Sequence, residues 1–187
     1  MKNINLENGK IYLKTYKDST SNLDFITAYF RTPKDTTNIS KPFNLALNDV
    51  NLHNIEFKYK NYLHKDTVIK GVNYNDVLIK HLSTNIQNID IKDHIFKAQI
   101  NHLSFQEKSG FILKDLTAKT TIDSNQIVLE NLRLTTPNTQ LTNYFSMKFK
   151  DFNDFNDLSN KVILEGHFKD TKVYAKDIAF FIPDLAG

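Results

Sequence analysis

The chain has 187 residues, a net charge of +3 and no cysteine, with 40% hydrophobic and 24% charged residues. This length suits one sizeable domain or part of a larger protein. The lack of cysteine excludes disulfide scaffolds and thiolate metal sites. Lysines, aspartates and glutamates are spread along the whole length, whereas a nucleic-acid-binding surface would cluster its lysines and arginines. We therefore expect solvated outer faces and no nucleic-acid partner.

The composition also bears on domain organisation. Only 5 glycines and 4 prolines occur, so no flexible linker is predicted and residues 1–187 are expected to form one unit. No run of about 18 apolar residues occurs, so no membrane-spanning helix is predicted. Polar residues follow Met1, so no signal peptide is expected. The sequence is then that of a cytosolic protein or of a segment from a longer, targeted chain.

The N-terminal part is predicted to hold two short strands and one helix. The strands, at residues 4–6 and 10–16, flank a turn at Asn8-Gly9. The helix is expected over residues 21–31, because Ser21-x-x-Asp24 resembles a capping box. Its apolar face would consist of Leu23, Ile26, Thr27 and Phe30.

The stretch from Phe111 to Leu134 shows the clearest pattern. Apolar residues alternate along it, which indicates two strands with one buried face and a turn at Ser124-Asn125. The alternation slips by one residue at Lys114-Asp115 and again at Glu130-Asn131. A β-bulge or bend absorbs one residue and returns the next apolar side chain to the buried face.

The same slip recurs between Phe43 and Phe105, where the chain is predicted to form successive strands. The second residue at each slip is Asp, Asn or His, and these residue types tolerate a left-handed backbone best after glycine. The alternative explanation is that asparagine is simply abundant here. We predict strand bends at Asp49, Asn54, His81, Asn88, His102, Asp115 and Asn131.

Two more short helices are expected near the C-terminus. Asp151 is predicted to cap the first, over residues 152–160, and Pro183 to end the second, over residues 175–182. Strands are expected at residues 144–149 and from Val162 onward.

The sequence offers little support for catalysis or metal binding. The 6 histidines include no closely spaced pair, and DFNDFNDLSN lacks the glycine and glutamate of a calcium loop. No nucleophile elbow, Walker loop or dinucleotide-binding motif occurs. Carboxylates such as Asp90 and Asp93 lie among lysines. We expect a protein that is not an enzyme and has no metal or cofactor.

The amphipathic strands are the strongest functional signal. One face carries Leu, Ile, Val and Phe, and the other carries Lys, Asn, Thr and Asp. This face is either an ordinary core closed by another layer, or an open apolar trough that holds acyl chains. The candidate trough residues are Ile86, Ile100, Leu116, Ala118, Ile127, Leu129 and Leu164.

Several segments resemble the AsmA-like part of the TamB translocation and assembly module proteins of Gram-negative bacteria. The most specific is LSFQEKSGFILKDLTAKTTIDSNQIVLENLRLTTPNTQL, and KDFNDFNDLSNKV, YAKDIAFFIPDL, SNLDFITAYF and KPFNLALNDVNLHNIEFKY are similar too. The resemblance implies a bent, twisted antiparallel sheet that forms a groove, the AsmA/TamB-like β-taco, with a few short helices.

The resemblance also implies a function. Such proteins are anchored in the inner membrane, cross the periplasm and meet an Omp85-type barrel at the outer membrane. They are implicated in phospholipid transfer between the membranes and in outer-membrane protein assembly. We expect this chain to be a middle piece of the groove, without the anchor helix and the C-terminal domain of the family. Alternatives are a scaffold that offers a strand edge to outer-membrane proteins, and a closed β-sandwich or solenoid that binds glycans or proteins.

Overall fold

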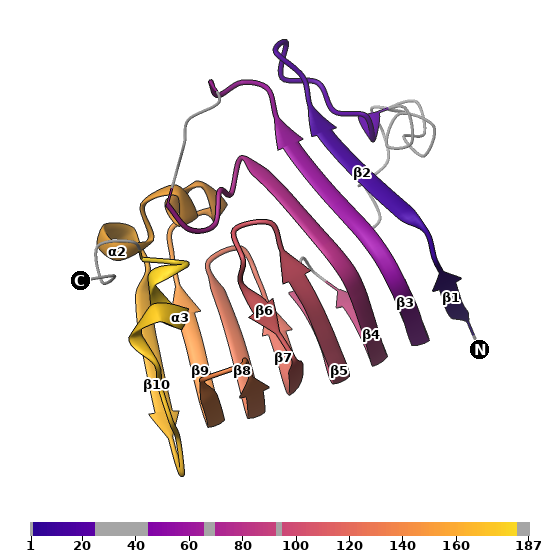
Figure 1. Ribbon diagram of the computed structural model, residues 1–187. Helices are drawn as coiled ribbons and strands as arrows, with labels where there is room; N and C mark the ends of the chain where they lie inside the picture. The colour runs from indigo at the N-terminus through magenta and orange to yellow at the C-terminus, as the bar shows by residue number, and fades with distance from the viewer. Residues whose placement is uncertain (1, 25–44, 66–69, 93–94, 183–187) are drawn as a thin grey trace, which may run out of the picture.

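The computed structural model describes residues 2–24, 45–65, 70–92 and 95–182. These residues form one large, twisted, open sheet in which the strands lie side by side (Figure 1). The expectation of a mainly β protein is therefore confirmed. A β-sandwich needs two packed sheets, and the described strands all belong to a single sheet.

The sheet contains ten strands among the described residues, in the order β1-β3-β4-β5-β7-β8-β9-β10, with β2 also paired to β3 and β6 to β5. Pairing is antiparallel from β3 to β10. The strands are β1 (Asn3–Glu7), β2 (Lys10–Thr15), β3 (Leu45–Asn61), β4 (Asp76–Lys92), β5 (Ile95–Glu107), β6 (Ile112–Leu113), β7 (Asp115–Ile122), β8 (Gln126–Thr135), β9 (Gln140–Lys148) and β10 (Ile163–Phe168).

Short helical segments lie at the β9–β10 end of the sheet (Figure 1). They are the 3-10 helix η1 (Phe152–Asp157) and the α-helices α2 (Leu158–Lys161) and α3 (Ala175–Ala179). Both helices expected near the C-terminus are therefore present. The Asp154 carboxylate accepts hydrogen bonds from the backbone N–H groups just before η1, from Lys150 at 2.8 Å and Asp151 at 3.4 Å.

The expected helix over 21–31 lies mostly outside the described residues. Its start is described, and there the Asp24 side chain reaches back to Ser21 as in a capping box, while the Ser21 hydroxyl contacts the N–H of Leu23 rather than that of Asp24. The Ser21 N–H donates to the Asp24 carboxylate at 2.8 Å, and the Ser21 hydroxyl oxygen accepts from the Leu23 N–H at 2.9 Å.

The chain does not reverse direction at the expected turn Asn8-Gly9. Both β1 and β2 pair in parallel with β3, so together they form one edge strand with a bend between them. Asn8 supplies that bend through a left-handed backbone, with φ 52°. The turn at Ser124-Asn125 does join antiparallel strands, β7 and β8.

Four of the seven predicted bend residues have the expected left-handed backbone. Asn54, His81, Asn88 and Asn131 have φ angles between 50° and 55°. The strand register shifts beside each of them, as a bulge requires. Left-handed backbone also occurs at Asn143, which the alternation did not single out.

The prediction of a left-handed bend is wrong for the other three residues, Asp49, His102 and Asp115. Asp49 stays in register with Gln87, and its carboxylate accepts hydrogen bonds from the Asn51 and Asn85 side chains, at 2.6 and 2.9 Å. At His102 the extra residue is its neighbour Asn101, because Asn85 pairs with His102 while Ile86 pairs with Ile100.

At Asp115 the strand is interrupted one residue earlier, at Lys114, between β6 and β7. Asp115 itself pairs in register with Thr135. The side chains of His102 and Asp115 are joined by a hydrogen bond of 2.6 Å, which holds both residues in ordinary strand positions on one face of the sheet.

The slips do return apolar residues to one face. Leu113 and Leu116, on the two sides of the Lys114 interruption, are 4% and 8% exposed and belong to one hydrophobic cluster. Leu132 belongs to the same cluster, and Leu129, before the bend at Asn131, packs against it. The other buried members are Phe111 and Ala118.

The left-handed residue Asn131 gives a direct test of this bend, because it is exposed and its side chain contributes no core packing. We expect Asn131→Val to lower the free energy of unfolding by about 1–2 kcal/mol, the cost of a β-branched side chain in this conformation. Asn131→Gly should change it by less than about 0.5 kcal/mol. Arg133→Val, exposed on the same strand, is the control. Equal losses for both valine variants in urea denaturation would contradict the assignment.

Candidate functional site

The seven candidate trough residues all lie on one face of the sheet. Directly paired residues on neighbouring strands point to the same side. One row of such pairs runs from Ile4 through Val50, Ile86 and Ile100 to Ala118. We call the face that carries this row the apolar face.

Three other rows hold the remaining candidates. Leu116 pairs with Leu134, and Leu129 pairs with Phe145. The longest row crosses six strands and ends at the edge strand β10. It consists of Ile91, Phe96, Ile122, Ile127, Met147 and Leu164. The alternation of apolar residues in the sequence identified the seven candidates. Their partners Ile4, Phe145 and Met147 follow the same alternation but were not among the candidates.

Burial differs strongly among these candidates. Ile86, Ile100, Ile127 and Leu129 are partly exposed, and Leu164 is 44% exposed. Leu116 and Ala118 are only 8% and 1% exposed, so the expectation that they are accessible is wrong. They lie in the hydrophobic cluster at the middle of the sheet, where Phe111 and Leu113 pack against them.

The segment around α3 covers part of the apolar face. Phe180, just after α3, packs against the hydrophobic cluster, and Phe180 and Phe181 both make edge contacts with the Phe111 ring. The Phe180 carbonyl also accepts a hydrogen bond of 2.7 Å from the Val72 N–H. Gly71 permits this approach, because it has φ +87° and a Cβ there would collide with the Phe180 carbonyl oxygen.

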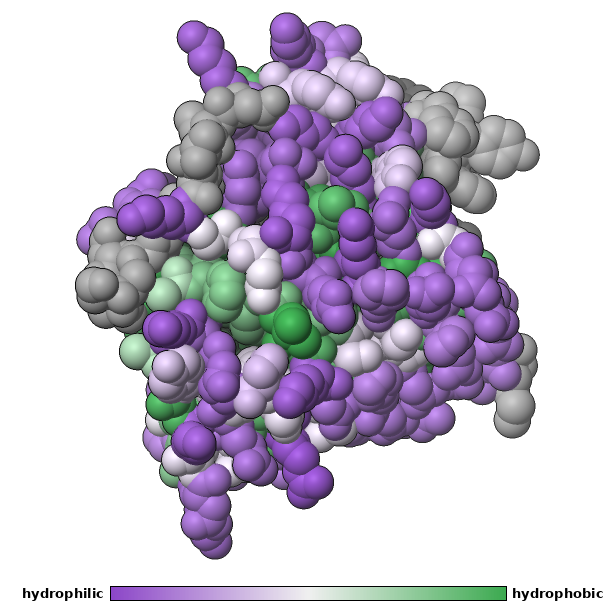
Figure 2. Space-filling view, in the orientation of Figure 1, coloured by the Kyte–Doolittle hydropathy of each residue, from purple (hydrophilic) through white to green (hydrophobic). Residues whose placement is uncertain are grey.

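Apolar side chains are more exposed toward the two edges of the sheet. On β1, Ile4 and Leu6 are 39% and 47% exposed, and on β10 Leu164 and Phe168 are 44% and 42% exposed. Phe168 stacks on Phe145 of β9. In the orientation of Figure 2 the surface is largely hydrophilic, with hydrophobic residues gathered in smaller patches, one of them beside α3.

The opposite, polar face carries a chain of asparagine side chains. Asn51 donates to Asn5 at 3.0 Å, Asn85 donates to Asn51 at 2.6 Å, and Asn101 donates to Asn85 at 2.7 Å. These bonds join β1, β3, β4 and β5. In these bonds the asparagine amides are hydrogen-bond partners of one another, which stabilises the polar face.

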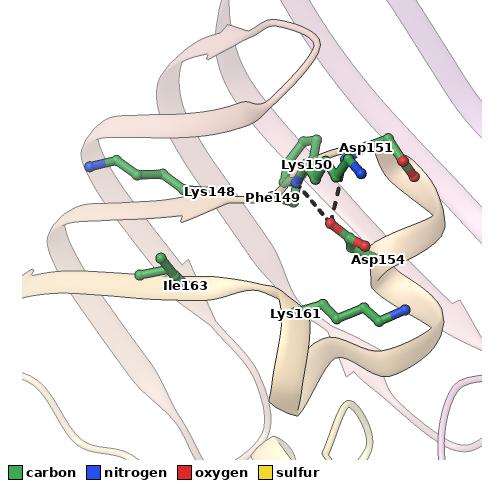
Figure 3. Close-up of a pocket in the computed structure, with 7 residues that line it drawn as sticks. All are labelled: Lys148, Phe149, Lys150, Asp151, Asp154, Lys161 and Ile163. Carbon is green, nitrogen blue, oxygen red and sulfur yellow. Dashed lines mark hydrogen bonds between the residues drawn. The ribbon is translucent and has the colours of Figure 1, made fainter.

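A shallow hollow of about 660 Å³ lies where β9, η1 and β10 meet (Figure 3). Lys148, Lys150 and Lys161 line it together with Asp151, Asp154, Phe149 and Ile163. Lys148 forms an exposed ion pair with Glu165 at 3.7 Å. Because the basic and acidic side chains are mixed and Asp154 is engaged with the backbone, the hollow has no strong preference for one charge.

A second hollow, of about 340 Å³, lies over the bends of β2, β3 and β4. Asn8, Asn54 and His81 line it, and all three have left-handed backbones. The Asn54 amide donates to Asn8 at 2.7 Å, and its oxygen accepts from His81 Nδ1 at 3.0 Å. This hollow therefore marks where three neighbouring strands bend together.

Asp76 forms ion pairs with two lysines. Its carboxylate contacts the ammonium groups of Lys108 at 2.8 Å and Lys60 at 3.1 Å. Partial burial acts to raise the pKa of Asp76, but the hydrogen bonds and positive charges of the two lysines outweigh it and lower that pKa below the usual value.

Neither a metal site nor a membrane span is found in the part of the chain that the structure describes. No group of three or more potential metal-ligating side chains occurs there. No helix within these residues is long and apolar enough to cross a membrane. Of the 6 histidines, His94 lies outside the described residues.

Comparison with protein-family models, with curated proteins and with solved structures gives no match for this chain.

The ion pairs of Asp76 with Lys60 and Lys108 predict that the stability of the fold depends on pH. Because the folded state lowers the pKa of Asp76, the interaction stabilises the fold above the ordinary aspartate pKa and is lost as the pH falls through the lower, folded value. We expect wild type to lose more unfolding free energy than Asp76→Asn when the pH falls from about 5 to about 2. Lys108→Gln should remove part of this difference. Parallel curves for wild type and Asp76→Asn in urea denaturation would contradict the prediction.

Positions on the apolar face differ in burial, so we expect a charged substitution to cost much more stability at a buried position than at an exposed one. We expect Ala118→Asp, at a position only 1% exposed, to unfold the chain or to cost at least about 3 kcal/mol, because the carboxylate would be buried without a partner. Leu164→Asp, at a position 44% exposed, should cost less than about 1 kcal/mol. Circular dichroism during urea denaturation measures both values, and similar losses for the two variants would contradict the assigned burial.

Proposed function

We propose that the apolar face binds phospholipid acyl chains without acting on them chemically and that the chain is a groove segment of a TamB/AsmA-like protein. The observation that carries the proposal is the set of paired apolar rows that cross the sheet from β1 to β10. In a groove of this kind the rows would form the floor along which acyl chains lie.

The exposure of the edge residues supports this reading. Burying apolar surface stabilises by about 25 cal/mol per Å², and soluble monomers rarely leave more than a few hundred Å² of contiguous apolar surface in water. Ile4, Leu6, Leu164 and Phe168 are each at least 39% exposed, and Ile4 and Leu164 end apolar rows at the two edges of the sheet. Acyl chains are unbranched and apolar, so they fit a long strip of aliphatic side chains without needing specific polar partners.

The TamB-like segments of the sequence support a setting for this activity. In the proposal, the full-length protein is anchored in the inner membrane, crosses the periplasm and contacts an Omp85-type barrel. The segment described here would shield phospholipids between the inner and outer membranes and so contribute to outer-membrane biogenesis. The groove, or β-taco, shape is part of the same proposal.

Two adjacent residues on β10 provide a matched test. Leu164 lies on the apolar face opposite Met147, whereas Ile163 pairs with Lys148 on the other face, and both are exposed. We expect wild type purified under mild conditions to carry phospholipid in native mass spectrometry. Leu164→Asp should reduce the bound lipid several-fold, since a carboxylate in the row repels the acyl chain and costs desolvation.

Ile163→Asp is the control, because it adds the same charge one residue away on the opposite face. It should leave the bound lipid unchanged. A wild-type chain that binds no added phospholipid would overturn the proposal. Equal loss in both variants would show that the lipid adheres through general surface properties rather than through the apolar face.

A second candidate function is a scaffold for outer-membrane protein assembly, and the edge strand β10 favours it. All six residues of β10 are exposed, and among the described strands it pairs only with β9. The strand contains no lysine or proline, the residues that often protect sheet edges. Such an edge can accept an incoming strand. Added strand peptides from an outer-membrane barrel should then slow amide hydrogen exchange in β10 selectively.

A further inference from the structure

Three side chains on the polar face form a hydrogen-bonded relay that the lipid-binding proposal does not use. His102 and Ser104 lie two residues apart on β5, and Asp115 begins β7. His102 Nδ1 lies 2.6 Å from Asp115 Oδ1, and His102 Nε2 lies 3.0 Å from the Ser104 hydroxyl oxygen. Both distances are hydrogen-bond distances.

When the His102 ring is neutral, the chemistry of its two partners fixes which nitrogen carries the hydrogen. An ionised carboxylate only accepts hydrogen bonds, so Nδ1 of His102 must carry the hydrogen that it donates to Asp115. In the neutral imidazole the other nitrogen, Nε2, is then an acceptor. Ser104 must therefore donate its hydroxyl hydrogen to Nε2. This order of carboxylate, imidazole and hydroxyl is the one by which a histidine activates a serine as a nucleophile.

Local irregularities of the strands produce this arrangement. The extra residue Asn101 lies just before His102, and the interruption at Lys114 lies just before Asp115. The relay is also accessible, because the side chains of His102 and Asp115 are 44% and 40% exposed. It lies on the face opposite the apolar rows, so it is independent of lipid binding.

We propose that Ser104 is an activated nucleophile that takes acyl groups from small, activated carboxylic esters. In the first step, Ser104 Oγ forms a bond to the ester carbonyl carbon while its proton passes to His102 Nε2. The bond from that carbon to the leaving oxygen then breaks, and the leaving alkoxide takes the proton from His102. Water, deprotonated by His102, attacks the acyl-serine in the same way and releases the carboxylic acid.

In this scheme Asp115 is a positioning residue that holds the reactive tautomer of His102. The substrate class follows from the open location. The two hollows described above are lined by other residues, so the site meets esters from solvent and depends on a good leaving group. Organophosphorus reagents that phosphorylate activated serines belong to the same reactive class.

The test is labelling of the 187-residue chain with a fluorophosphonate and, separately, with p-nitrophenyl acetate, followed by peptide mass spectrometry. We expect Ser104 to be modified much faster than Ser83, which pairs with it on β4 and provides a control within the same molecule. A positioned general base contributes on the order of 10²–10⁴-fold, so His102→Gln should slow labelling of Ser104 about 100-fold. Labelling of Ser83 should not change.

Ser104→Ala should abolish the fast labelling, and circular dichroism checks that each variant is folded. Asp115→Asn, which keeps the shape of the side chain, should slow labelling and move the ¹⁵N imidazole signals of His102 toward the other tautomer. A purely structural role for Asp115 would leave those signals in place. Equal labelling of Ser104 and Ser83 in wild type, or an unchanged Ser104 rate in a folded His102→Gln variant, would overturn the proposal.

Discussion

The whole sheet depends on bends that coincide on neighbouring strands. A bulge on one strand reverses the facing of every later residue on that strand, so the neighbouring strand must compensate near the same level. Asn8, Asn54 and His81 do so across three adjacent strands and are linked through their side chains. Each left-handed residue costs backbone energy, and the hydrogen bonds between the three side chains offset part of that cost. Without this alignment the apolar rows would break at the bends.

The bends were predictable because their signal is local. At Asn54, His81, Asn88 and Asn131 the slip in alternation and the residue type point to the same position, and the backbone is left-handed there. At Asp49, His102 and Asp115 the slip was present, but contacts to other strands decided how the chain absorbs it. The Asp49 carboxylate is held by two asparagines, one of them on β4, and His102 and Asp115 hold each other. Such pairings depend on strand register, which a single sequence does not contain.

The membership of the apolar face was also predictable, since alternation assigns each residue to one side of a strand. Its accessibility was not. Leu116 and Ala118 have the same pattern as Ile127 and Leu129, yet they are buried. The difference arises from aromatic residues close and distant in sequence, Phe111 and Phe180, which pack on the cluster that contains them. The relay of His102 with Ser104 and Asp115 was missed for a similar reason, because its members belong to two strands and no short motif joins them.

The parallel edge strand has a consequence for how the chain folds. The first strands, β1 and β2, pair with residues of β3 that follow them by about 46 positions, as the Asn5–Asn51 and Asn8–Asn54 contacts show. Closing so long a loop costs entropy before any contact offsets it, so high contact order slows this step. In the β3-β4-β5 meander, two residues separate β4 from β5 and 14 separate β3 from β4, far fewer than the separation of about 46 positions at the N-terminal edge. The meander can therefore form first. The N-terminal edge, β1 and β2, would then add last, to strands that are already bent. In that order β3 sets the register of β1 and β2, and β1 and β2 do not influence how β3, β4 and β5 pair.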